Sequence, residues 1–157
     1  MKYCLLSKEQ FESLNIDFAK FLASQQLDAN EWNAIKKTKP QIAQKELELF
    51  SDLVWEEVLT KTKFIEHISP KELNLFNCSV IAMHRLVVKI DKPDFDFNEV
   101  SDFNWFLKNL NHQSLSYFQA QKKYIDSRTI ELFQLIQKGG EITDGALYQT
   151  ILNQLKS

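Results

Sequence analysis

Apolar residues recur at helical spacing in the first part of the chain, and each stretch opens with a signal that starts a helix. Ser7 and Gln10 form a capping box, in which each side chain can bond to the backbone amide of the other residue. Asp28 is a second N-cap, and Pro40 suits the first turn of a third helix. The pattern therefore predicts helices over residues 8–25, 29–37 and 40–60.

The pattern changes after Lys63, where β-branched and aromatic residues predominate. Three segments, 64–68, 73–78 and 80–90, are expected to form an antiparallel meander. The third has the clearest alternation, with an apolar face formed by Val80, Ala82, Leu86, Val88 and Ile90. Its other face is mixed. A fourth strand is expected over residues 115–124.

Helical spacing returns around and after this fourth segment. A helix is expected over residues 102–110, a second follows Asp126 as its cap, and a last one follows Thr143. Helices flank the strands without strict alternation, which predicts an α+β fold. We expect N-terminal helices, a central antiparallel meander of three to four strands and C-terminal helices, all in one domain over residues 1–157.

Composition and charge narrow the class of protein. The 157 residues are 44% hydrophobic and 12% aromatic, which favours a folded core over disorder. The net charge is -2 with both signs interspersed, so nucleic-acid binding is disfavoured. Two cysteines far apart indicate a reducing compartment, and no signal peptide or membrane span is apparent. We therefore expect a cytoplasmic protein with no membrane partner.

One group of residues could form the dispersed site of a small enzyme. His84 lies on the apolar face of the third strand, where a buried imidazole needs hydrogen-bond partners or a shifted pKa. His67 and the carboxylates of Glu66, Asp94 and Asp96 are the other candidates for acid–base chemistry. A hydrogen-bonded structural histidine is the simpler interpretation of His84.

Few motifs for metals, phosphates or nucleophiles are present. The histidines are scattered, and the chain has only three glycines, none in a phosphate-binding pattern, so neither a metal nor a cofactor is expected. Glu48, Asp52 and Glu56 share one face of the third predicted helix and could offer oxygens to a cation. A solvated helix face explains them more simply.

Aromatic residues favour a non-catalytic interaction module with a protein partner. Trp32, Trp105 and Tyr117 are the candidate anchors, because interfaces concentrate such side chains, although core packing is the alternative. An exposed strand edge could also pair two copies into a homodimer. A nucleic-acid accessory role ranks third and would use the lysines at positions 36, 37, 39, 122 and 123.

Three stretches resemble a family of small uncharacterised bacterial proteins, a domain of unknown function. They are Met1-Lys2-Tyr3 with Leu6-x-Lys8-Glu9-Gln10, Phe50-Ser51-Asp52-Leu53-Val54-Trp55-Glu56, and Gly140-Glu141-Ile142-Thr143-x-Gly145-x-Leu147-Tyr148. The resemblance runs over most of the chain. It implies a bacterial protein and supplies no activity or site residues.

Overall fold

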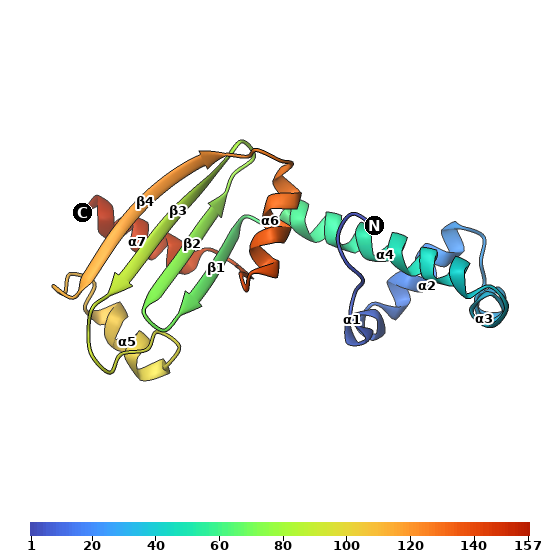
Figure 1. Cartoon of the computed structure of the whole chain (residues 1–157), viewed down its shortest axis with the longest axis horizontal. Coiled ribbons are helices and arrows are strands. Elements are labelled where there is room, and N and C mark those ends of the chain that lie inside the picture. Colours follow the sequence, from blue (N-terminus) through green and yellow to red (C-terminus); the bar gives the residue numbers. More distant parts are fainter. The chain divides into compact units, whose positions relative to one another are not determined.

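The computed structural model describes all of residues 1–157 (Figure 1), and the chain divides into two compact units, residues 1–60 and 61–157. The units are described in turn. That they fold together as one domain stays a prediction.

The first unit is helical. It contains α1 (Lys8–Ser13), α2 (Asn15–Ser24), α3 (Ala29–Thr38) and α4 (Pro40–Lys61), whose last residue lies in the second unit. The capping box at Ser7 and Gln10 is confirmed, with amide-to-side-chain distances of 2.8 and 3.1 Å.

The helix expected over residues 8–25 is broken at Leu14 into α1 and α2. The Ser13 hydroxyl donates to the Gln10 carbonyl at 2.9 Å, and the Leu14 amide is shared between the carbonyls of Gln10 and Phe11. Serine competes in this way with the regular helical bonds, so the first helix ends after little more than one turn.

Aromatic rings fill the centre of the helical unit. Phe18 lies 5.0 Å from Phe50 and 5.4 Å from Trp32 between ring centroids, in edge-to-face arrangements. Phe11 and Phe21 also pack on Phe50, at 6.0 and 5.4 Å. These rings join α1 and α2 to α4, and Trp32 joins α3 to α2.

The second unit is a five-stranded antiparallel sheet with three helices, so the α+β class is confirmed. Its strands, in the order β4-β3-β2-β1-β5 across the sheet, are β4 (Leu115–Lys123), β3 (Ala82–Ile90), β2 (Glu72–Cys78), β1 (Phe64–Ser69) and β5 (Glu141–Thr143). Its helices are α5 (Val100–Lys108), α6 (Arg128–Gln137) and α7 (Ala146–Lys156).

Four local expectations in this unit need correction. The count of three to four strands missed β5, in which Thr143 is paired with Phe64 rather than capping α7. Gly145, with a left-handed φ of +84°, takes that cap position. Ser127 rather than Asp126 caps α6, since its hydroxyl accepts from the Ile130 amide. Val80 precedes β3 and is 85% exposed.

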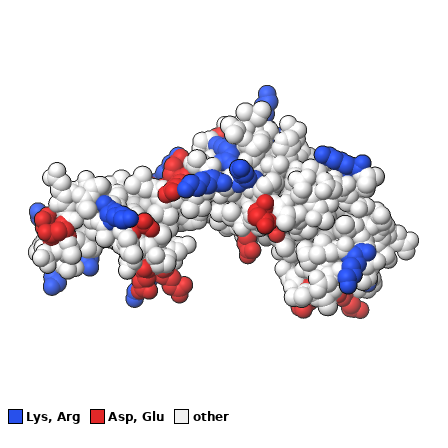
Figure 2. Space-filling view, turned by 180° about the vertical axis from the view of Figure 1, so that it is seen from behind, with Lys and Arg blue, Asp and Glu red and all other residues white.

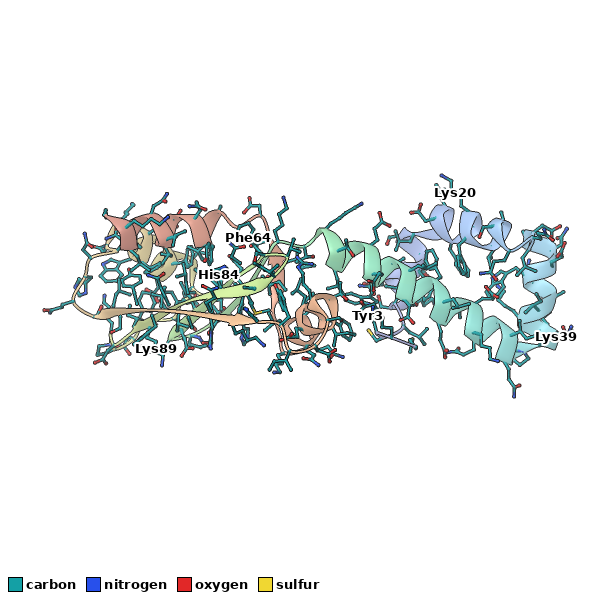
Figure 3. All side chains as sticks on the ribbon, turned by 90° about the horizontal axis from the view of Figure 1, so that it is seen from above. Tyr3, Lys20, Lys39, Phe64, His84 and Lys89 are labelled. Carbon is teal, nitrogen blue, oxygen red and sulfur yellow. The ribbon has the colours of Figure 1, made fainter.

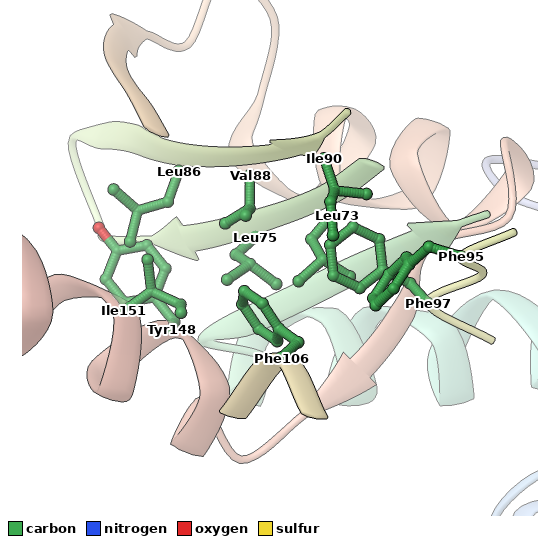
Figure 4. Close-up of a cluster of buried hydrophobic side chains, with 10 residues drawn as sticks. All are labelled: Leu73, Leu75, Leu86, Val88, Ile90, Phe95, Phe97, Phe106, Tyr148 and Ile151. Carbon is green, nitrogen blue, oxygen red and sulfur yellow. The ribbon is translucent and has the colours of Figure 1, made fainter. Parts of the chain in front are cut away.

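The main core lies on one face of the sheet, where α5 and α7 pack (Figure 4). Phe106 of α5 and Ile151 of α7 are fully buried there. The strands contribute Leu73, Leu75, Leu86, Val88 and Ile90. Period-two alternation therefore directs the apolar faces of β2 and β3 toward these helices.

Candidate functional site: the open face of the sheet

The sheet presents a second face that α5 and α7 do not cover. The pairing register places alternate residues of β2, β3 and β4 side by side on it. We call this surface the open face, and define it as Asn74, Phe76, Met83, Arg85, Val87, Lys89, Phe118, Ala120 and Lys122. It is the mixed face that alternation predicts for the third strand.

Helix α6 borders the open face and turns one end of it into a groove. The groove has a volume of about 450 Å³, and its wall includes Glu131, Gln134 and Leu135 of α6, the C-cap residue Lys138 and Gly140. Its floor is formed by open-face residues of three strands, and His67 completes it. The lining combines apolar side chains with charged and amide groups, so the groove offers a ligand both apolar contact and polar partners.

Arg85 is one of the cations that line the groove. Its Nε donates to Asn74 Oδ1 at 2.9 Å, a terminal nitrogen donates to the same oxygen, and its guanidinium carbon lies 5.7 Å from the centre of the Phe76 ring. The side chain is exposed and forms no ion pair. These contacts hold the guanidinium beside the Phe76 ring and leave its charge available to a ligand.

Lys122 and Glu131 form the ion pair of the groove. Lys122 Nζ donates to the buried Glu131 carboxylate, which also accepts from the Asp126 amide at 3.2 Å. Burial raises the pKa of Glu131, but the bonds from Lys122 and the backbone outweigh this effect and leave the pKa below its ordinary value. The Glu131 carboxylate is thus neutralised by Lys122. Arg85 and Lys138 are the groove cations that have no carboxylate partner.

The structure separates the two candidate histidines. His67 is exposed at the groove, where Gly139 packs against its ring, whereas His84 points to the opposite face of the sheet (Figure 3). His84 is half-buried and lines a shallow hollow with Asn77, Gln119, Tyr148 and Leu152, which contains no carboxylate.

The candidate carboxylates do not meet His84 either. Glu66 shares its face of the sheet, but it lies opposite Leu75 and binds Thr143 at 3.4 Å, while His84 lies opposite Asn77. Burial raises the pKa of Glu66. Asp94 and Asp96 follow the far end of β3, where Asp96 accepts from the Asn98 amide. The five residues therefore form no common site.

Cys78 is a buried residue rather than an accessible nucleophile. Its side chain is 2% exposed, and burial raises its pKa to about 11 despite the nearby Arg128 guanidinium. The Arg128 side chain donates to the Cys78 carbonyl at 3.0 Å, which ties the end of β2 to α6. Its position is that of a small core residue.

The three candidate aromatic anchors are half-buried and contact their own unit. Trp32 packs on Phe18 in the helical unit. Trp105 lies 5.9 Å from Phe95, with the Lys92 ammonium 4.2 Å from its ring, and the Tyr117 hydroxyl donates to the Leu110 carbonyl at 2.6 Å. In contrast, Phe118 on the open face is 52% exposed.

Two carboxylates of α4, those of Asp52 and Glu56, hold the first residues of the chain in place. Asp52 accepts from the backbone amides of Lys2 and Tyr3 at 2.7 and 2.9 Å, and Glu56 accepts from the Lys2 ammonium and the Tyr3 hydroxyl. Figure 3 shows Tyr3 beside α4. Hydrogen bonds from Tyr3 and Lys2 lower the pKa of Glu56. Two of the three carboxylates therefore have a structural role that their spacing alone did not reveal.

The lysines proposed for nucleic-acid binding are divided between the two units. Lys36 and Lys37 lie in the last turn of α3 and Lys39 is its C-cap, whereas Lys122 and Lys123 lie in the other unit, on opposite faces of β4. In the view of Figure 2, basic and acidic residues are both spread over the surface.

Arg85, Asn74 and Phe76 were not identified as site residues from the sequence. The one signal was the mixed composition of the strand face on which Arg85 lies. Whether a mixed face is solvated or covered depends on where the helices pack, so the groove could not be located from alternation alone.

Fold and surface together define an α+β protein with one helix-covered and one open sheet face. A family model matches residues 1–156, and the chain belongs to that family of unknown function, DUF6495. This confirms the resemblance found in the sequence. No curated protein and no solved structure matches the chain. None of the helices has both the length and the apolar character needed to cross a membrane.

Proposed function

We propose that this protein is a non-catalytic interaction module of the bacterial cytoplasm, and that its open face binds an acidic, partly apolar segment of a partner protein. The observation that carries the proposal is the environment of Arg85. An exposed guanidinium without a carboxylate partner lies beside the Phe76 ring in the lining of a groove.

The surroundings of Arg85 support such a ligand. Exposed Phe118 and the half-buried Phe76 supply apolar contact, and Lys138 adds a second cation. Arginine and aromatic residues dominate the energetic centres of protein interfaces. A carboxylate of the partner can pair with the two outer nitrogens of a guanidinium, which gives both affinity and direction. The separation of His67, His84 and the candidate carboxylates favours binding over acid–base chemistry.

The test is a comparison of two charge reversals in the full-length protein. Arg85→Glu changes the centre of the open face. Lys123→Glu is the matched control, because Lys123 is exposed on β4 and points to the other face. We expect Lys123→Glu to change the free energy of unfolding by only about 0.5 kcal/mol. Arg85→Glu should cost about 1–2 kcal/mol, because it also loses the bonds to Asn74 and the contact with Phe76. Thermal unfolding checks these expectations.

Each tagged protein is used to recover partners from a nuclease-treated lysate of the source bacterium, and co-eluting proteins are quantified by mass spectrometry. We expect a stoichiometric partner that the wild type and Lys123→Glu retain and that Arg85→Glu loses by at least ~tenfold, corresponding to about 1.4 kcal/mol. A partner retained equally by all three proteins would contradict the assignment of the open face. Recovery of no partner by the wild type would contradict the proposed function itself.

Single-stranded nucleic acid is a second candidate ligand, because two cation–aromatic pairs lie on the open face. The Arg85 guanidinium carbon lies 5.7 Å from the Phe76 ring centre and the Lys89 ammonium lies 5.5 Å from the Phe118 ring centre. Sheet faces of this composition can stack bases. This function predicts salt-dependent binding of a fluorescent oligo(U) or oligo(dT) that Phe118→Ala weakens. Unchanged anisotropy at low salt would exclude it.

A further inference from the structure

Strand β4 forms a long free edge of the sheet. It has nine residues, Leu115–Lys123, and only β3 pairs with it, whereas the opposite edge strand, β5, has three residues. Figure 1 shows β4 as the outermost strand of the unit. All of β4 from Phe118 onward is exposed.

The hydrogen bonds between β3 and β4 show which backbone amides and carbonyls of β4 have no partner in the sheet. The Asp91 amide donates to the Ser114 carbonyl at 2.8 Å, and the same register continues along β3 and β4. Residues of β4 at even positions therefore bond to β3. The odd positions Tyr117, Gln119 and Gln121 direct their amides and carbonyls away from the sheet.

The usual protection of an edge strand is missing over most of β4. Natural edges are shortened, bulged, or carry lysine or proline so that a second chain cannot add to them. From Leu115 to Gln121 the strand has no charge and no proline, its pairing with β3 is unbroken, and lysines occur only at positions 122 and 123. Such an edge is a ready template for another strand.

The strand is complementary to itself in one particular register. When two copies run antiparallel about a two-fold axis at Gln119, all nine residues pair and the outward-facing odd positions oppose one another. Phe118 then lies beside Ala120 of the second copy. Lys122 and Lys123 lie opposite Ser116 and Leu115, so that no two like charges face each other.

We propose that two copies of this chain associate through antiparallel pairing of their β4 strands, centred on Gln119. The two sheets become one continuous sheet across the two-fold axis. Because Phe118 and Ala120 are on the open face, the open faces of the two copies adjoin as well. This inference stands on the edge geometry and does not rest on the proposed binding of a partner protein.

The test uses position 119, because Gln119 is expected to lie opposite Gln119 of the second copy on the two-fold axis. Gln119 is exposed, so Gln119→Lys and Gln119→Glu should both fold, which circular dichroism verifies. Each variant places two like charges in contact across the axis, whereas a mixture of the two places a lysine opposite a glutamate. Gln121→Lys is the matched control, because its expected neighbour on the second copy is Tyr117.

Sedimentation equilibrium over a range of concentrations gives the association state. For a chain of 18.4 kDa, we expect the wild type and Gln121→Lys to reach twice that mass. Each Gln119 variant alone should dissociate at least ~tenfold more readily, and their equimolar mixture should regain the dimer. A monomeric wild type at every concentration would overturn the inference, as would dimers that neither charge at position 119 weakens.

Discussion

The assignment of the two faces of the sheet makes a quantitative prediction for two phenylalanines. Phe106 of α5 is fully buried, and its ring lies edge-on to Phe97 at 5.1 Å and 90°. Phe106→Ala removes a whole ring from a packed core and leaves a cavity, which typically costs about 3–5 kcal/mol. For a chain of this length, such a loss lowers the melting temperature by roughly 6–20 °C.

The matched control is the same substitution on the open face. Phe118 is 52% exposed and its one aromatic contact is with the Lys89 ammonium. An exposed cation–aromatic pair contributes about 0.5–1 kcal/mol, so Phe118→Ala should cost no more than that. Phe106→Leu, which retains most of the apolar volume, should fall between the two alanine variants.

Urea unfolding followed by far-ultraviolet circular dichroism gives the free energies, and thermal unfolding gives the melting temperatures. Phe106→Ala within about 1 kcal/mol of the wild type would refute the core position of this ring. An equal loss in Phe118→Ala would refute the distinction between a covered and an open face. The second result would also remove the basis of the proposed binding surface.

Three further predictions concern buried or constrained groups. In a Cys4→Ser background, Cys78 should resist iodoacetamide at neutral pH until urea unfolds the chain, because it is buried and its pKa is about 11; rapid labelling of the native protein would contradict this. Because folding lowers the pKa of Glu131, its contribution is present above the ordinary value of 4.5 and is lost as the pH falls through the folded-state pKa. Glu131→Gln should therefore flatten the dependence of the urea midpoint on acid pH, and identical profiles would disprove the role of this carboxylate. Gly145→Ala should destabilise by about 1–3 kcal/mol, because φ is +84° and a Cβ atom would lie 2.4 Å from the Phe64 ring; an unchanged midpoint would count against that contact.

The sequence located most elements because their signals are local. A cap such as Ser7 acts on an amide three residues away, and alternation within residues 82–90 is visible in one segment. The break at Leu14 was missed because the competing bond of the Ser13 hydroxyl has no clear signature in the pattern. The strand β5 was missed because three residues become a strand only when the edge of β1 is there to pair with them.

The candidate site divides in the same way. Alternation correctly placed His84 on the apolar side of the third strand, and helical spacing correctly aligned Asp52 with Glu56. Neither alternation nor helical spacing could identify the residues that contact these side chains. Asn77 and Tyr148 beside His84, and Lys2 and Tyr3 beside the carboxylates, come from segments distant along the chain.

The sequence by itself thus determined the α+β class and most of the helices and strands, since backbone bonding and side-chain periodicity act over a few residues. It also indicated the family, through the resemblance of three stretches. The tertiary structure decided which face of the sheet α5 and α7 cover, which edge stays free and where Arg85 is presented. These features depend on strand order and on contacts between residues far apart in sequence. No local pattern encodes such contacts, because they form only when the chain between the segments folds back and brings them together.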